Sequence, residues 1–164
     1  MLTIEVKVDG ALMKGANASA VVDREMNAAM HASTQHMRGL VIPKTPVGVT
    51  AMLRGGTQAT VTSSGSDFSI DGRVFNPSAY GLPVELGRMA GKRQPPSSAL
   101  EMWVRRKLNV PENRVKSVAF LVARKIGRQG TKAVEMFAKA FEEGKGTVNG
   151  FFDRAAARVV EALS

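Results

Sequence analysis

Apolar and polar residues alternate along three short stretches of the chain. The first covers residues 2–8, the second residues 57–62 and the third residues 68–74. A period of two is typical of a strand with one buried face. The residues between the second and third stretches, 63–67, are Ser, Gly and Asp, which favour a tight turn. We therefore predict a hairpin that joins the N-terminal strand in an antiparallel sheet of about three strands.

Apolar residues recur at helical spacing along most of the remaining chain. Residues 11–38 contain no proline and repeat apolar residues at helical intervals, which predicts one long helix that Pro43 and Pro46 end. Further helices are predicted from the capping-box sequence Ser98–Glu101 and from the first turn at Pro111.

Glycine and polar residues divide the C-terminal part of the predicted helical region. Thr131 is expected to open a helix that continues to about residue 143, where a group of three glycines ends it. Asn149 is then expected to cap a last helix. The glycines that separate these two helices are Gly144, Gly146 and Gly150.

The order of the elements predicts an α+β fold. A small antiparallel sheet packs with a long N-terminal helix and several C-terminal helices, rather than alternating with helices as in a doubly wound sheet. At 164 residues the chain has the length of one domain. We expect residues 1–143 to form that domain and residues 144–164 to form a C-terminal helical extension.

The chain is strongly basic. It has 23 Lys and Arg against 14 Asp and Glu, a formal net charge of +9. Between residues 104 and 132 there are nine basic residues and a single acid, Glu112. Such a balance favours anionic partners, which include nucleic acid, a membrane surface or an acidic protein face. A solvated helical surface explains the same run of charge equally well.

Residues suited to catalysis or metal binding are few. The chain has no Cys, which excludes disulfides, thiol nucleophiles and thiolate metal sites. His31 and His36 lie five apart in one predicted helix, whereas metal-binding pairs on a helix lie three or four apart. The Gly87–Lys92 segment is one residue too short for a phosphate-binding P-loop. We therefore predict no enzyme activity, no metal and no cofactor.

No segment predicts insertion into a membrane. The longest apolar run has six residues, 118–123, and a membrane-spanning helix needs about 20. The N-terminus lacks the basic start and apolar stretch of a signal peptide. We expect the protein to be made and used in a cytoplasm-like compartment, with no membrane partner.

Three stretches between about residues 23 and 141 share their order and spacing with one known family. The first stretch is Thr45-Pro46-Val47-Gly48, Thr50 and Leu53-Arg54; the second is Tyr80, Val84-Glu85 and Gly87; the third is Pro95-Pro96, Leu100, Trp103-Val104-Arg105-Arg106-Lys107, Ala123-Arg124-Lys125-Ile126 and Gly130-Thr131-Lys132. Together they resemble the small tail-component proteins of long-tailed bacteriophages. This is the neck or tail-completion family, encoded among the head–tail joining genes.

The resemblance implies a virion structural protein and not a catalyst. Such subunits are assembled in the host cytoplasm into a ring of identical copies at the head–tail junction. The ring contacts a head-side connector and tail-side terminator or tube proteins, and DNA passes through its lumen without sequence-specific binding. Ring interfaces are head-to-tail and close by rotation. The alternative is a basic protein that binds nucleic acid non-specifically through its phosphates.

Two loops, 45–54 and 88–97, are expected to dock on neighbouring rings. Glu85 would pair with a basic residue of the next subunit, and Arg54 would face an acidic neighbour or DNA, although a solvated charge is an equal alternative for each. Trp103 is expected in the core. The full set of candidate interface or docking residues is Thr45, Pro46, Arg54, Glu85, Arg88, Lys92, Arg93, Arg105, Arg106, Lys107 and Lys132.

Overall fold

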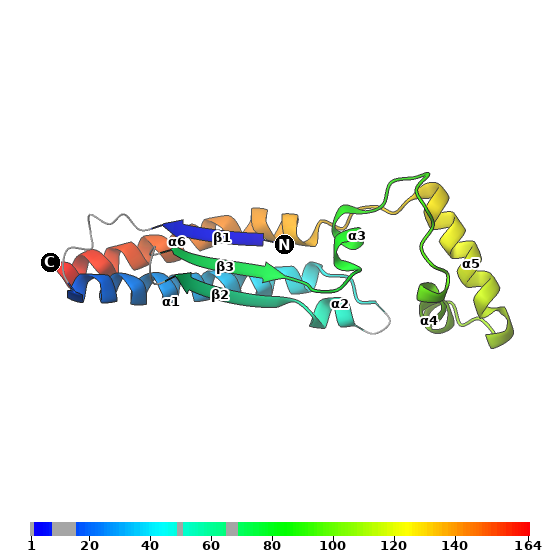
Figure 1. Cartoon of the computed structure of the whole chain (residues 1–164), viewed down its shortest axis with the longest axis horizontal. Helices are drawn as coiled ribbons and strands as arrows, with labels where there is room; N and C mark the ends of the chain where they lie inside the picture. Colours follow the sequence, from blue (N-terminus) through cyan, green and yellow to red (C-terminus); the bar gives the residue numbers. More distant parts are fainter. Residues whose placement is uncertain (1, 8–15, 49–50, 65–68) are drawn as a thin grey trace. The chain divides into compact units, whose positions relative to one another are not determined.

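The computed structural model describes residues 2–7, 16–48, 51–64 and 69–164 (Figure 1). Strands and helices of the described residues form an α+β fold, as predicted, with a three-stranded antiparallel sheet. The elements are β1 (Leu2–Lys7), α1 (Ala16–Lys44), α2 (Met52–Gly55), β2 (Gln58–Ser64), β3 (Ser69–Phe75), α3 (Gly81–Leu86), α4 (Ser98–Lys107), α5 (Glu112–Gln129) and α6 (Met136–Leu163).

The chain divides into two compact units. The sheet unit consists of Met1–Lys44, Thr57–Asn76 and Phe137–Ser164, and so holds the sheet and the two longest helices. The helical unit consists of Thr45–Gly56 and Pro77–Met136, with α2, α3, α4 and α5. The domain boundary predicted between residues 143 and 144 lies inside α6.

The sheet has the strand order β1-β3-β2, with both pairs antiparallel. Helix α1 covers the face to which Ile70 and Val74 of β3 point, and both residues are buried. Gly72 lies between them on the same face. A Cβ at Gly72 would collide with the Met30 Sδ and would lie 2.6 Å from the Thr34 Cγ2. The close approach of α1 to β3 therefore requires a glycine at position 72.

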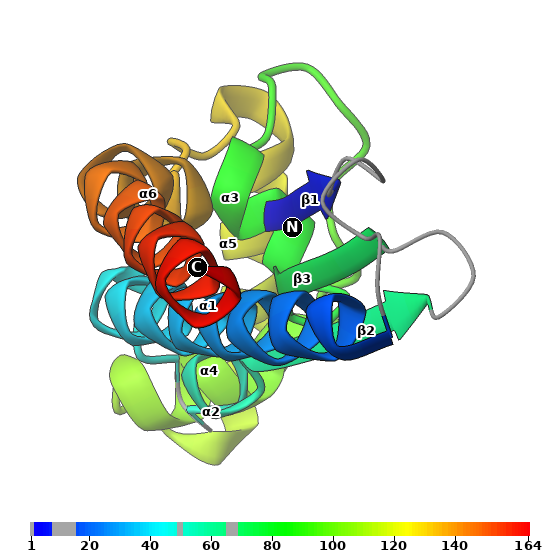
Figure 2. The same ribbon diagram turned by 90° about the vertical axis from the view of Figure 1, so that its left-hand side faces the viewer.

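Helix α6 runs beside α1 within the sheet unit (Figures 1 and 2). A Cβ at Gly144 would lie 2.5 Å from the Met37 Sδ, so this glycine marks a close contact between the two helices. Further along, the rings of His36 and Phe151 meet edge to face, with centroids 6.0 Å apart. Lys44 and Glu143 form an ion pair with a separation of 2.5 Å between Nζ and Oε2.

The predicted break between two C-terminal helices is wrong, because α6 continues through all three glycines. A glycine inside a helix costs about 1 kcal/mol relative to alanine. Burial of apolar residues along α6, such as Ala140, Ala155 and Val159, outweighs that cost. At position 144 the absence of a side chain also allows the close contact of α6 with Met37 of α1.

Other predicted helix limits also differ. Helix α1 passes through Pro43 to Lys44, since burial of Val41 stabilises this part of the helix. Pro43 has no amide hydrogen to donate to the carbonyl of Gly39, but Gly39 is exposed and its carbonyl can bond to water. Residues 11–15, predicted to begin this helix, lie outside the described residues. The predicted helix start at Thr131 is wrong, because this residue forms a β-bridge with Arg88.

The predicted capping box of α4 does not form. Ser98 is the first residue of the helix and Ser97 is its N-cap, so the serine and glutamate of the predicted box do not flank the helix start as the motif requires. No side-chain hydrogen bond caps α4 at Ser97. Here the sequence motif is one residue out of register with the helix.

Small aliphatic residues hold the core of the helical unit together. Val104 of α4 packs with Val115 and Ala119 of α5, and all three are buried. Trp103, predicted as a core residue, is 38% exposed. The prediction is wrong because a neighbouring residue on the helix, Val104, occupies the buried position and consecutive residues point in different directions.

Two glycines in an unusual conformation follow helices of the helical unit, Gly87 after α3 and Gly130 after α5. Gly87 and Gly130 have φ of 70° and 71° with ψ of −171° and −165°. They flank the bridge in which the backbone amides of Arg88 and Thr131 each donate to the other's carbonyl, at 3.0 and 2.9 Å. This region of backbone space is essentially restricted to glycine.

Glu25 of α1 forms an ion pair with Arg158 of α6. Its Oε2 accepts from the Arg158 Nε at 2.5 Å, and its Oε1 accepts from the Arg24 Nε at 3.1 Å. The hydrogen bond from Arg158 is the largest influence that lowers the pKa of Glu25, and Arg24 adds to it against the effect of burial. The stabilisation is present above the ordinary carboxyl pKa and is lost as the pH falls through the lowered pKa.

We expect Arg158→Gln to raise the pKa of Glu25 more than Arg24→Gln does, because Arg158 supplies the larger hydrogen-bond contribution. An NMR titration of the Glu25 carboxyl in each variant measures this directly. Asp153→Asn on α6 serves as a control that leaves both arginines in place. Equal shifts in the two arginine variants would contradict the assignment of Arg158 as the main partner.

Candidate interaction surfaces

The excess positive charge of the chain belongs entirely to one unit. The helical unit has 13 Lys and Arg against four Asp and Glu, and so accounts for the whole net charge of +9. The sheet unit has ten basic and ten acidic residues, and its net charge is zero. The electrostatic attraction for an anionic partner therefore comes from the helical unit.

Cations cover the exposed side of α5, opposite the buried face formed by Val115 and Ala119. At 3.6 residues per turn, Arg114, Lys125 and Arg128 share the side that faces away from those two residues. The basic residues of α5 are all exposed, and they are Arg114, Lys116, Arg124, Lys125 and Arg128.

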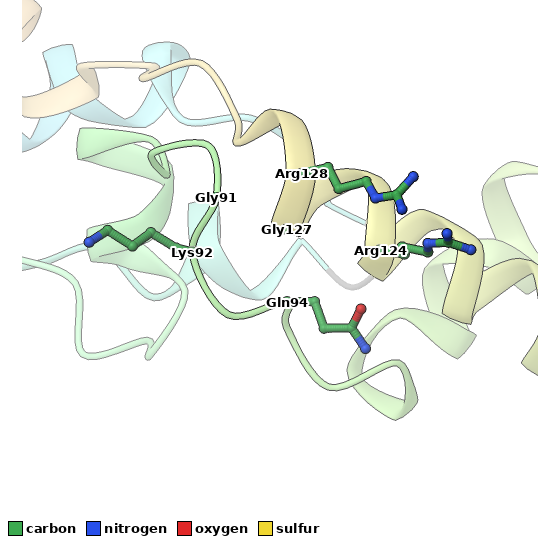
Figure 3. Close-up of a pocket in the computed structure, with 6 residues that line it drawn as sticks. All are labelled: Gly91, Lys92, Gln94, Arg124, Gly127 and Arg128. Atoms are coloured by element: carbon green, nitrogen blue, oxygen red, sulfur yellow. The ribbon is translucent and has the colours of Figure 1, made fainter.

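A hollow of about 290 Å³ lies where the loop after α3 meets the C-terminal half of α5 (Figure 3). Arg124 and Arg128 extend from α5 to the same side in this view, and the Gln94 amide lies below them. Lys92 leaves the loop in the opposite direction. The residues that line the hollow are Gly91, Lys92, Gln94, Arg124, Gly127 and Arg128.

Backbone contacts fix the loop against α5. The Gly91 amide donates to the carbonyl of Gly127 at 2.9 Å. A Cβ at Gly127 would lie 3.0 Å from the Gln94 Cβ, so the loop packs directly on the helix backbone. The Arg88 guanidinium donates through Nη2 to the carbonyl of Arg93 at 3.0 Å. One main-chain hydrogen bond and one hydrogen bond from the Arg88 side chain thus hold the loop that forms the hollow.

Of the predicted docking residues on this loop, Lys92 and Arg93 are exposed and Arg88 is half-buried. Lys132 is exposed and directly follows Thr131, the partner of Arg88 in the bridge. The structure therefore brings these four predicted residues, which come from two segments, to the region where the loop meets the C-terminal end of α5.

The basic triplet on α4 points in several directions. Arg106 and Lys107 are exposed, and Arg105 donates from Nε to the Glu112 Oε2 at 2.7 Å. That hydrogen bond lowers the pKa of Glu112 and raises the pKa of Arg105. Arg105 is therefore used to join α4 to the start of α5.

Three of the remaining predicted residues, Thr45, Arg54 and Glu85, take part in contacts within the helical unit. Arg54 donates from Nε and Nη2 to the carbonyl of Thr45, at 3.1 and 3.0 Å, and Thr45 is fully buried while Pro46 is exposed. The backbone carbonyl of Glu85 accepts from the amide of Glu135 at 3.2 Å. The guanidinium of Arg54 thus closes the 45–54 loop on itself.

Exposed apolar side chains form a feature that was not predicted from the sequence. Leu82 and Leu86 are 67% and 69% exposed and lie four residues apart on α3, so they share one face of that helix. The spacing of the two leucines is visible in the sequence, but the exposure of their side chains is not. Other exposed apolar residues of the helical unit are Val47, Met52, Tyr80, Met89, Met102, Trp103, Leu108, Phe120 and Leu121.

Neither a metal centre nor a membrane span occurs in the part of the chain that the structure describes. No group of three or more His, Asp or Glu side chains there could hold a metal ion. None of the described helices combines the length and the apolar character needed to cross a bilayer. No family model, no curated protein and no solved structure matches this chain.

Proposed function

We propose that this chain is a structural subunit of the head–tail junction of a long-tailed bacteriophage. It assembles into a ring of identical copies, contacts neighbouring head-side and tail-side rings, and acts without chemical catalysis. The observation that carries the proposal is the exposed Leu82–Leu86 pair, which lies inside the Tyr80–Gly87 stretch of the family resemblance. Clustered exposed apolar residues mark protein–protein contact sites.

The charge distribution supports the same proposal. A neutral sheet unit and a basic helical unit give the subunit one part that attracts DNA and one part that does not. In a ring through which DNA passes, the basic unit provides contacts to phosphates without sequence preference. The proposed location of the protein is therefore the virion neck, after assembly in the host cytoplasm.

We expect the double variant Leu82→Asp/Leu86→Asp to remain folded but to lose assembly with its own copies. Both side chains are mostly exposed, so replacement costs the isolated chain little, whereas a charge in an apolar contact opposes association. Mass photometry measures the assembly and far-UV circular dichroism measures the fold. The matched control is Val160→Asp/Leu163→Asp, which changes two exposed apolar residues of α6.

A direct test is the position of the protein in particles released from a host that encodes it. Antibody-linked gold at the neck in negative-stain images supports the proposal. Intact particles that lack the protein, as judged by mass spectrometry, contradict it. So does normal assembly of the Leu82→Asp/Leu86→Asp variant, because the apolar pair would then have no part in subunit contact.

The concentration of all net charge in the helical unit favours a second candidate function. In it, the protein binds nucleic acid non-specifically and forms no ring. The two candidates differ in assembly: the second predicts DNA binding by a monomer at every protein concentration, and no signal at the neck of a virion.

A further inference from the structure

We infer that the hollow between the loop at Gly91 and the C-terminal half of α5 binds phosphates of the duplex DNA backbone. Arg124 and Arg128 are the main ligands, the Gln94 amide adds a donor, and Lys92 contacts the backbone from the other side of the loop. This inference concerns the isolated chain and does not depend on ring assembly.

The charge around the hollow has no internal counterpart. Residues 86–100, which supply the loop, contain no Asp or Glu, and neither do residues 113–134, which supply the helix. None of the ion pairs among the described residues involves Lys92, Arg124 or Arg128. These cations are therefore available to an external anion, unlike Arg105, which is paired with Glu112.

Two arginines on one side of a helix bind a phosphate better than a single isolated charge does. Arg124 and Arg128 lie one helical turn apart, so their guanidinium groups leave α5 on the same side. The planar guanidinium offers several donors that match phosphate oxygens in pairs. The side-chain amide of Gln94 can donate to the same group.

Two carbonyls at the helix end beside the hollow have hydrogen-bond partners, which reduces their opposition to an anion. The last carbonyls of a helix lack partners and carry partial negative charge. In α5 the carbonyl of Ile126 accepts from the Gly130 amide at 2.8 Å, and the carbonyl of Gly127 accepts from the Gly91 amide at 2.9 Å. The loop that forms the hollow thus satisfies one of these terminal carbonyls, and the C-cap residue Gly130 satisfies the other.

The surroundings of the hollow indicate a polymer rather than a small anion. No aromatic or large apolar side chain lines it, so it offers no platform on which a base could stack. Exposed cations continue beyond it, with Arg114 and Lys125 on α5, Arg93 on the loop and Lys132 after the bridge. A series of cations fits the regularly repeated phosphates of a duplex, and such contacts do not depend on the DNA sequence.

The test measures fluorescence anisotropy of two labelled DNA duplexes of unrelated sequence with the full chain, between about 50 and 200 mM salt. We expect equal affinity for both duplexes and a steep loss of affinity with salt. Arg124→Gln/Arg128→Gln should raise Kd at least about tenfold and reduce the slope of log K against log salt by about 2. The matched control Arg106→Gln/Lys107→Gln removes the same charge from α4 and should leave Kd nearly unchanged.

Three results would overturn the inference. Absence of DNA binding at low salt removes it, and so does equal weakening by the two double variants, which would assign binding to overall charge. Binding of polyglutamate without binding of DNA would assign the hollow to an acidic polypeptide. Circular dichroism of each variant confirms that the exposed substitutions leave the fold intact, and mass photometry without DNA reports assembly separately.

Discussion

Gly130→Ala is expected to lower the free energy of unfolding of the helical unit by about 3 kcal/mol. Gly130 has a φ of 71° and a ψ of −165°, a conformation that residues with a Cβ rarely adopt. A Cβ there would also collide with the Arg88 carbonyl oxygen and would lie 2.9 Å from the Ala90 amide. Both neighbours are backbone atoms, so the bridge between Arg88 and Thr131 must open to relieve the collision.

Urea titration followed by tryptophan fluorescence measures this effect, because the chain's one Trp, Trp103, lies in the helical unit. Two other glycines of that unit provide graded controls. Gly91 has a φ of 76° but open space around its Cβ position, so Gly91→Ala should cost only about 1 kcal/mol. Gly55 has open space and no positive φ, and Gly55→Ala should change little. Equal effects at positions 91 and 130 would show that the bridge yields easily.

Met30→Ala is expected to destabilise the sheet unit by about 3 kcal/mol, because Met30 is fully buried between α1 and β3. Gly72→Ala should cost about 2 kcal/mol by itself, since the new Cβ meets the Met30 side chain. In the Met30→Ala background the same change should cost about 1 kcal/mol less, because the obstructing sulfur is gone. The Thr34 Cγ2 stays close to the Cβ position, so part of the penalty remains.

Far-UV circular dichroism in urea, with hydrogen exchange at β3, gives the four free energies of this cycle. Met37→Ala is the matched control: Met37 is equally buried in α1, but it contacts Gly144 of α6. Its effect should add to that of Gly72→Ala without coupling. Additive effects of Met30→Ala and Gly72→Ala would contradict the contact between them.

The sheet could be predicted from the sequence because its physical signal is local. Alternation of apolar and polar residues at 2–8, 57–62 and 68–74 corresponds to β1, β2 and β3 within one or two residues at each end. A strand with one covered face leaves this pattern regardless of what covers it. The α+β class followed from the order of those strands and the helical stretches.

Helix limits were less predictable because they depend on contacts between distant segments. Pro43 and Gly144 were expected to end helices, yet each lies inside one, since Val41 is buried and Gly144 lies against Met37. The predicted burial of Trp103 was wrong for a related reason. Helix α4 buries Val104 against α5, whereas the size and apolar character of Trp103 alone favoured its burial. Tertiary packing decides such cases over local propensity.

The sequence predicted cations near the proposed phosphate site but not their arrangement. Lys92 and Arg93 were selected as docking residues, whereas neither Arg124 nor Arg128 was. Arg124 appeared within the basic run and the stretch 123–126 of the family resemblance, and Arg128 within the basic run alone. The contact of Gly127 with Gln94, which places the loop against the helix, joins residues more than 30 positions apart. No local sequence pattern predicts such a contact. The basic run could be predicted because charge follows directly from residue identity.

The division of the chain also imposes an order on its synthesis. The sheet and α1 are made before their partner helix α6, which begins only at Met136. The segment 77–136, which lies between them, can fold while it emerges, since domains form as units during translation. Until α6 arrives, the side of α1 around Met37 is uncovered. A nascent chain halted before residue 136 would therefore be a natural client for a chaperone.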